Sequence, residues 1–156
     1  MSRAYIDLRF APNWDLIDSA REFVLGFFSV ALSDRALAEH LCLAVHELVE
    51  NAIKYYRSDE ARIRVEVDGD GPIRIAVENH AVSEEISVLL EEVKAISTAA
   101  DPLAFYRGRI EETLSRGDGR SRIGLARIRC EAQMKLECHV SGGVVRMVAL
   151  RERCAA

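Results

Sequence analysis

The sequence is poor in the features that mark fibrous, disulfide-rich and membrane-spanning proteins. Its 156 residues include 3 Pro and 9 Gly, with 49% hydrophobic and 29% charged residues, which excludes collagen-like and disordered chains. Four cysteines without a CxxC spacing indicate neither a disulfide framework nor a structural zinc site. The longest apolar runs, such as 27–32, are far shorter than the roughly 18 residues of a membrane span.

The charged residues limit the expected compartment and partners. Asp7 and Arg9 interrupt the N-terminal segment where a signal peptide has an unbroken apolar core, so we expect a cytoplasmic protein without membrane attachment. The net charge is −4, but residues 1–106 hold 10 basic and 19 acidic residues, whereas residues 107–156 hold 11 and 6. Because a nucleic-acid ligand requires a concentrated basic face, we expect no nucleic-acid partner.

Hydrophobic periodicity predicts both strands and helices along the chain. Alternating residues predict strands over 4–10, 62–67, 73–77, 134–140 and 144–150. Helical spacing predicts helices over 16–28, 34–56, 83–96, 103–114 and 123–132. Four of the five strands cluster in two hairpins instead of alternating with helices. We therefore expect an α+β two-layer sandwich, with a mixed, mostly antiparallel sheet of about five strands and helices on one face.

The long helix predicted up to about residue 56 carries a polar stripe beside its apolar one. Glu47, Asn51 and Lys54 or Tyr55 are spaced at i, i+4 and i+7 or i+8, so they share one helix face. A carboxylate and an amide one turn apart suit phosphate chemistry, the first as a base and the second as a ligand of a hard cation. The alternative is an ordinary solvated face, because Glu and Lys are common on surface helices.

The segment that contains this stripe has a family resemblance. Residues 44–54, AVHELVENAIK, resemble the N-box of the GHKL superfamily, and the chain is most similar to the short anti-sigma-factor kinases of the SpoIIAB and RsbW type. The resemblance covers nearly the whole chain in the order of its elements. It implies one domain over 1–156 with a Bergerat fold, and ATP and Mg²⁺ as cofactors. In that family the N-box Glu, here Glu47, is the catalytic base and the Asn, here Asn51, is a magnesium ligand.

The adenine-binding motif of the family is altered in this chain. The family carries an Asp-x-Gly-x-Gly box after the second hairpin strand, and its Asp accepts a hydrogen bond from the adenine. The corresponding residues 79–83 read NHAVS, so the resemblance puts Asn79 at the adenine position, or Glu78 in an alternative alignment. The side chains of Ala81 and Ser83 oppose the close approach of backbone to nucleotide that glycine permits.

The phosphate-binding motif of the family is also altered. Its Gly-x-Gly-Leu box reads Arg122-Ile123-Gly124-Leu125 here, so one glycine of two remains. The resemblance implies nucleotide contacts from Arg122, Gly124 and Leu125 with Lys54 near the phosphates, and the alternative is that Gly124 only permits tight packing.

The stretch between the two boxes differs from the glycine-rich mobile lid of nucleotide-binding relatives. Residues 83–120 are predicted to form a helical lid-region insert, whose apolar stripe needs burial in its own domain or against another chain. A lid already folded as helices would sit over the nucleotide site or fill it.

Two main functional hypotheses follow from the sequence. The first is a bacterial signalling regulator that binds a sigma factor, a STAS-type antagonist or a response regulator in a partner-switching or phosphorelay pathway. The resemblance implies a homodimer, and the changes in both boxes predict weak or lost ATP binding. The alternative is an active ATP/Mg-dependent serine kinase that uses Glu47 and Asn51, and the sequence leaves open which applies. A structural subunit or small-molecule sensor is a third possibility.

Overall fold

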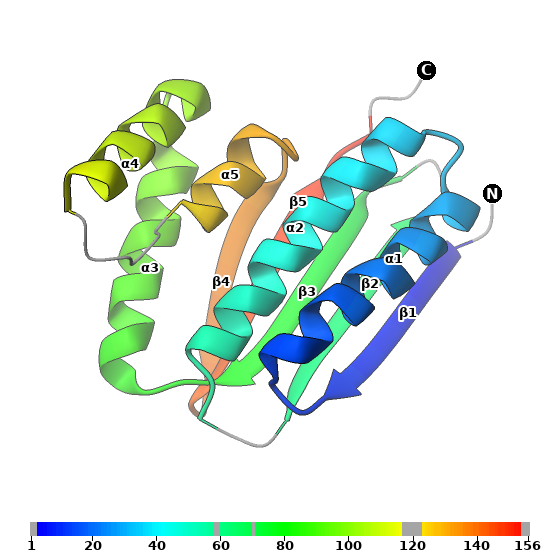
Figure 1. Cartoon of the computed structure of the whole chain (residues 1–156), viewed down its shortest axis with the longest axis horizontal. Helices are drawn as coiled ribbons and strands as arrows, with labels where there is room; N and C mark the ends of the chain where they lie inside the picture. The colour runs from blue at the N-terminus through cyan, green and yellow to red at the C-terminus, as the bar shows by residue number, and fades with distance from the viewer. Residues whose placement is uncertain (1–2, 58–59, 70, 117–122, 154–156) are drawn as a thin grey trace.

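The computed structural model describes residues 3–57, 60–69, 71–116 and 123–153 of the chain (Figure 1). The strands β1 to β5 are Arg3–Phe10, Ala61–Asp68, Ile73–His80, Lys135–Ser141 and Val144–Arg151. The helices α1 to α5 are Ile17–Ala31, Arg35–Lys54, Ser83–Thr98, Pro102–Arg116 and Gly124–Cys130. A short 3-10 helix, η1, spans Trp14–Leu16 before α1.

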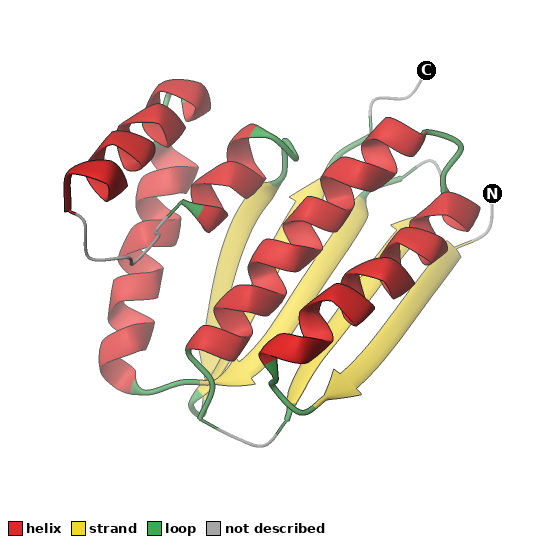
Figure 2. Ribbon diagram, viewed as in Figure 1, coloured by secondary structure: helices red, strands yellow, loops and turns green. Residues whose placement is uncertain are grey.

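The five strands form one open sheet in the order β1-β2-β3-β5-β4. Each of the four neighbouring pairs is antiparallel. Figure 2 shows the helices packed over one face of this sheet, while the other face carries no helix from the described residues. The prediction of a two-layer α+β sandwich is therefore confirmed.

The helix α2 is the main helix of the core. Asp34 begins it as the N-cap, because its carboxylate accepts a hydrogen bond from the Leu37 amide at 3.1 Å. Nine residues of α2 are buried against the sheet and α1: Ala38, Leu41, Cys42, Ala44, Val45, Leu48, Val49, Ala52 and Ile53. This burial fixes the helix face that carries the predicted polar stripe.

The strand β3 places the two candidate adenine-contact residues, Asn79 and Glu78, on opposite faces of the sheet. The strand continues to His80, three residues beyond the predicted end, because its last residues pair with β5. Asn79 lies on the helix-facing side and is 7% exposed. Glu78 points to the open face, where it forms an ion pair with Arg146 at 3.3 Å. Only Asn79 is on the side of the candidate site.

The region predicted as a lid insert forms two helices in its described part. α3 buries Val93 and Ile96 and packs against β4 and α5. α4 packs against α5 and has no fully buried residue. That 83–120 is an insert within one domain over 1–156 stays a prediction. No helix in the described ranges is long and apolar enough to cross a membrane.

Candidate functional site

Of three cavities beside the C-terminal half of α2, two are lined by Asn51. The larger, which we call the polar cavity, has a volume of about 330 Å³. Its lining comes from α2, α3, α4 and the start of α5: His46, Glu47, Glu50, Asn51, Lys54, Tyr55, Glu92, Tyr106, Ile123, Gly124, Leu125 and Arg127. The smaller, the apolar cavity, has a volume of about 20 Å³ and lies between α2, α3 and the strands β3 and β5.

The fold brings most of the predicted site residues together. Five of them line the polar cavity, although they come from parts of the sequence about 70 residues apart: Glu47, Asn51, Lys54, Gly124 and Leu125. Asn79 does not line this cavity; it lines the apolar one and also a cavity of about 170 Å³ at the strand ends. Asn51 and Tyr55 line both the polar and the apolar cavity, so these two cavities share a wall. Arg122 lies outside the described residues.

Glu47 is the central charged group of the polar cavity. Its side chain is 12% exposed, and its Oε1 accepts a hydrogen bond from Arg127 Nη1 at 3.2 Å. Burial raises the pKa of the Glu47 carboxyl, and the Glu50 carboxylate adds to this, whereas the Arg127 guanidinium opposes it. A raised pKa suits a general base, but the ion pair occupies one of the oxygens such a base would use.

Arg127 belongs to a chain of polar contacts that joins three helices. On α5 its Nε donates to Glu131 Oε2 at 3.1 Å, and Glu131 Oε1 accepts from the Tyr106 hydroxyl of α4 at 3.0 Å. Burial and the Glu131 carboxylate raise the pKa of the Tyr106 phenol. The position of α4 is therefore coupled to the Glu47 carboxylate on α2 through Arg127 of α5 and Glu131, the residue that follows this helix.

Gly124 allows α5 to approach α2 closely. A Cβ at this position would collide with Glu47 Oε2 and lie 3.3 Å from Glu47 Cδ. A larger residue would displace either the Glu47 side chain or the start of α5. The glycine therefore has a packing role at the candidate site. Because α5 has only seven residues and begins beside a carboxylate, its first turn alone is no anion site.

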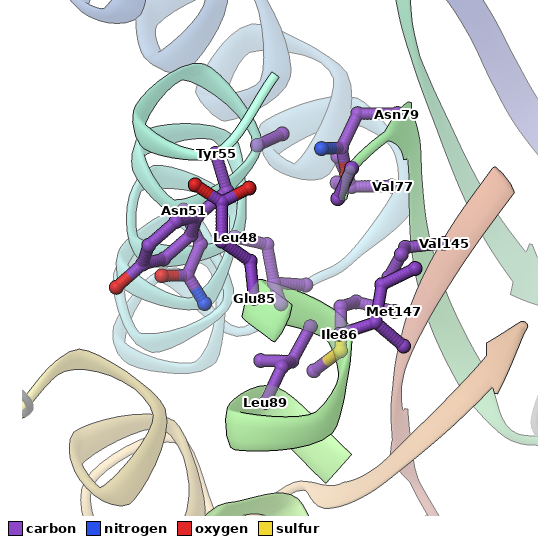
Figure 3. Close-up of a pocket in the computed structure, with 12 residues that line it drawn as sticks. Leu48, Asn51, Tyr55, Val77, Asn79, Glu85, Ile86, Leu89, Val145 and Met147 are labelled. Carbon is purple, nitrogen blue, oxygen red and sulfur yellow. The ribbon is translucent and has the colours of Figure 1, made fainter. Parts of the chain in front are cut away.

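Side chains from α3 occupy the space next to Asn79. Figure 3 shows Ile86, Leu89 and Met147 together between α2 and β5, close to Asn51. Asn79 Nδ2 donates a long hydrogen bond, 3.4 Å, to the His80 carbonyl. A cavity of about 20 Å³ has room for about one water molecule. The space beside the predicted adenine contact is thus filled by apolar side chains of the same chain.

The residues present do not fit a complete Mg-ATP. The apolar cavity that Asn79 lines lacks the volume for a purine. The polar cavity is large enough for a small ligand, but three carboxylates and two basic side chains line it, and one of the basic groups, Arg127, already pairs with Glu47. No group of three or more His, Cys, Asp or Glu side chains in the described part of the chain is placed to hold a metal ion.

The sequence did not predict that Arg127 pairs with Glu47 or that α3 side chains fill the apolar cavity. Arg127 is 80 positions from Glu47, so no local spacing connects them. One signal was present: Arg127 and Glu131 are at i and i+4, a spacing that forms ion pairs on a helix. The apolar stripe of α3 was recognised, but periodicity alone does not tell which cavity Ile86 and Leu89 enter.

Comparisons with known proteins support the fold independently of these residues. No protein-family model matches the sequence, and no curated protein matches it. Solved structures do match. A chain from the SiaB-SiaC complex of Pseudomonas aeruginosa is similar with a TM-score of 0.73 and 17% identity, over 94% of this chain and 88% of that one. The chain shares a GHKL-like α+β fold with this structure.

A second similar structure contains the RsbU and RsbW domains of a Mycobacterium tuberculosis protein. Its TM-score is 0.61 at 12% identity, and the match covers 96% of this chain but 32% of that longer chain. Identities this low establish the shared fold and leave function to be argued from the site. The predicted GHKL-like α+β fold is therefore confirmed, whereas the roles of the site residues stay predictions.

Proposed function

We propose that this chain is a bacterial signalling regulator that acts by binding other proteins and binds ATP weakly or not at all. The observation that carries the proposal is the filled apolar cavity, where Ile86 and Leu89 leave about 20 Å³ between Asn51 and Asn79. Binding a purine there would require α3 to move and to expose apolar surface that is now covered. A regulator that works through its surface needs no such movement.

The partners that we propose are those of a cytoplasmic partner-switching or phosphorelay pathway. A sigma factor, a STAS-type antagonist and a response regulator are the three candidates. Support comes from the similar structures, one of which is a SiaB-SiaC complex and the other a chain with RsbU and RsbW domains. The fold is thus one that occurs in protein complexes.

An active serine kinase is the second candidate function. It is favoured by the survival of Glu47 and Asn51 on the wall of one cavity, with the pKa of Glu47 raised toward the range of a general base. In this alternative Lys54, Gly124 and Leu125 would contact phosphates, and Asn51 would bind the Mg²⁺ that bridges them. When bound, the metal-nucleotide would supply the phosphoryl group.

Calorimetric titration with Mg-ATP separates the two candidates. If the chain is a regulator that does not bind ATP, we expect no heat of binding up to millimolar nucleotide, for the unaltered chain and for Asn51→Ala alike. If the chain is an active kinase, we expect micromolar binding of Mg-ATP that Asn51→Ala removes. The loss of a metal ligand lowers the binding free energy by on the order of 1–3 kcal/mol or more. Micromolar binding sensitive to Asn51 would overturn our proposal.

Capture of a partner tests the positive half of the proposal. The immobilised chain is incubated with an extract of its host with and without ATP, and retained proteins are identified by mass spectrometry. We expect a sigma factor, a STAS-type protein or a response regulator to be retained equally in both conditions. Incubating that partner with this chain and radiolabelled ATP should then give no labelled product. Labelling that Glu47→Gln abolishes would establish the kinase instead.

A further inference from the structure

The face of the sheet that the helices leave open carries a cavity of about 320 Å³. Figure 2 shows all the described helices on the other face. Alternate residues of a strand point to the same side, and the register sets Arg64 beside Ala76 and Glu78 beside Arg146. We call this cavity the arginine basin. Its lining comes from three neighbouring strands and consists of Arg62, Arg64, Glu66, Arg74, Ala76, Glu78 and Arg146.

Positive charge is in excess in the arginine basin. The lining contains four guanidinium groups and two carboxylates. Two further residues pair with it from outside. Asp7 forms ion pairs with Arg62 and Arg64 of β2. Arg3 forms an ion pair with Glu66 at 2.8 Å. The whole network therefore holds five guanidinium groups and three carboxylates, a surplus of two positive charges.

The surplus lies on β3 and β5. Arg74 forms no hydrogen bond or ion pair with any residue in the described ranges, although Glu66 is its neighbour across the β2–β3 register. Arg146 has Glu78 as its carboxylate partner at 3.3 Å, and Glu78 also lies 3.8 Å from Arg62. Because each guanidinium group has five N–H donors, Arg74 and Arg146 keep donors available for an anion between them.

Ala76 forms the floor of the arginine basin. It is the one uncharged residue of the lining and is 3% exposed. Alanine is depleted in strands, where β-branched and aromatic side chains are preferred. Any longer side chain at this position would project from the open face into the cavity. A small residue surrounded by long charged ones is therefore what keeps the basin hollow.

We infer that the arginine basin binds the phosphate group of a small phosphorylated molecule, with Arg74 and Arg146 as its ligands. Guanidinium groups bind phosphate oxygens through paired, charge-assisted hydrogen bonds. A phosphate monoester carries close to two negative charges at neutral pH, which matches the surplus of two on the protein. A carboxylate or a sulfate ester carries one negative charge and would leave half of the surplus uncompensated.

A small molecule fits the arginine basin better than a protein surface does. A protein that covered the basin would also remove water from the neighbouring ion pairs of Arg62 and Arg64 with Asp7, at a cost in desolvation. A ligand that contacts only Arg74 and Arg146 leaves those pairs hydrated. The volume of about 320 Å³ lies at the lower end of small-ligand sites. Because the basin is open to solvent, we expect a dissociation constant on the order of 1 mM or somewhat below.

Nuclear magnetic resonance titration of the ¹⁵N-labelled full chain with glycerol 2-phosphate, at constant ionic strength, tests this inference. We expect saturable shifts of β3 and β5 amides around Ala76 and of the Arg74 and Arg146 Nε–Hε signals. Methyl sulfate, a monoanion, should bind several-fold more weakly. The titration uses neither ATP nor a protein partner, so its outcome is independent of the proposed function. No saturable shift up to about 10 mM ester would overturn the inference, and so would equal affinity for methyl sulfate.

Neutralising the two arginines locates the site. Arg74→Gln and Arg146→Gln should each weaken binding of glycerol 2-phosphate about tenfold. Arg35→Gln is the matched control, because it makes the same charge change at a side chain that is 92% exposed at the start of α2, in the other layer. It should leave the affinity unchanged. Equal weakening by all three variants would reduce the effect to the net charge of the chain and overturn the site.

Two further variants should move the affinity in opposite directions. Ala76→Ile keeps the charge but fills the floor, so it should abolish binding while the melting temperature stays equal or rises, since isoleucine is the better strand residue. Glu78→Gln removes the carboxylate that competes for Arg146 and should tighten binding a few-fold. A folded Ala76→Ile variant with full affinity would overturn the basin as the site, and an unchanged affinity in Glu78→Gln would contradict Arg146 as a ligand.

Mg-ATP distinguishes the arginine basin from the polar cavity. The Mg²⁺ of Mg-ATP already occupies phosphate oxygens, so we expect it to bind to the basin more weakly than the simple ester does. Any shifts that it causes around Ala76 should persist in Asn51→Ala and disappear in Arg74→Gln. Shifts around Ala76 that Asn51→Ala removes would contradict a separate site.

Discussion

The helices α2 and α4 both line the polar cavity, but they are held in place in different ways. α2 buries nine side chains, whereas α4 buries none and is attached through half-buried and polar contacts such as the hydrogen bond from Tyr106 to Glu131. A helix held by burial keeps its position when the residues around it change, whereas a few polar contacts fix a helix only weakly. Glu47 and Asn51 therefore lie on the more firmly held of the two helices.

The largest expected effect comes from truncating one leucine on each helix. Leu41 on α2 has no exposed surface, so Leu41→Ala should cost about 2–5 kcal/mol of unfolding free energy. Leu114 on α4 is 78% exposed, and Leu114→Ala should change the same quantity by less than about 0.5 kcal/mol. Urea denaturation at one temperature measures both. Similar losses of unfolding free energy in the two variants would mean that α2 and α4 are held equally firmly.

The second prediction removes the ion pair between Arg127 on α5 and Glu47 on α2. Arg127→Met leaves the Glu47 carboxylate, 12% exposed, without its cation, and it also removes the ion pair to Glu131. Because the Arg127 side chain is 40% exposed and partly screened by water, we expect a loss of about 1 kcal/mol in the free energy of unfolding. Arg129→Met on the same helix is the control and should have a smaller effect. Equal effects would mean that the contact with Glu47 contributes nothing.

The third prediction concerns α4 alone. Tyr106→Phe removes the hydrogen bond to Glu131, which contributes about 1 kcal/mol. The loss should appear as faster hydrogen exchange of the α4 amides, with the α2 amides unchanged, because α4 can open without unfolding the core. Tyr5→Phe on β1, where the ring is 59% exposed, should leave both helices unchanged. Faster exchange in α2 would show that the two helices unfold as one unit.

The smallest expected effect is a change in pH dependence. The pKa of Glu47 is raised in the folded chain, so the folded state binds the proton more tightly than the unfolded state does. This carboxyl therefore lowers stability as pH rises through the interval between its unfolded and folded pKa values, and the penalty is complete above the folded value. Glu47→Gln should remove that part of the decline. An unchanged pH profile of the unfolding free energy would contradict a raised pKa.

The sequence predicted the elements well because their signals are local. Alternation and turn residues fix both hairpins, and helical spacing places Glu47 and Asn51 on one face, which proves to be a cavity wall. The sequence did not predict contacts between residues far apart in the chain. The end of β3 depends on pairing with β5, which carries the strand through Asn79.

Two further features of the structure also lacked a local signal. The exposure of Phe23 on α1 depends on which of the two adjacent apolar stripes of this helix the sheet covers. The filling of the adenine side depends on how α3 docks, because its stripe fits any apolar surface equally well.

The most direct test of the account is a crystal structure determined in the presence of Mg²⁺ and a non-hydrolysable ATP analogue. The account predicts that Ile86 and Leu89 stay between α2 and β5, with no purine beside Asn79. Density for an adenine ring at Asn79, with α3 displaced from the strands, would contradict it.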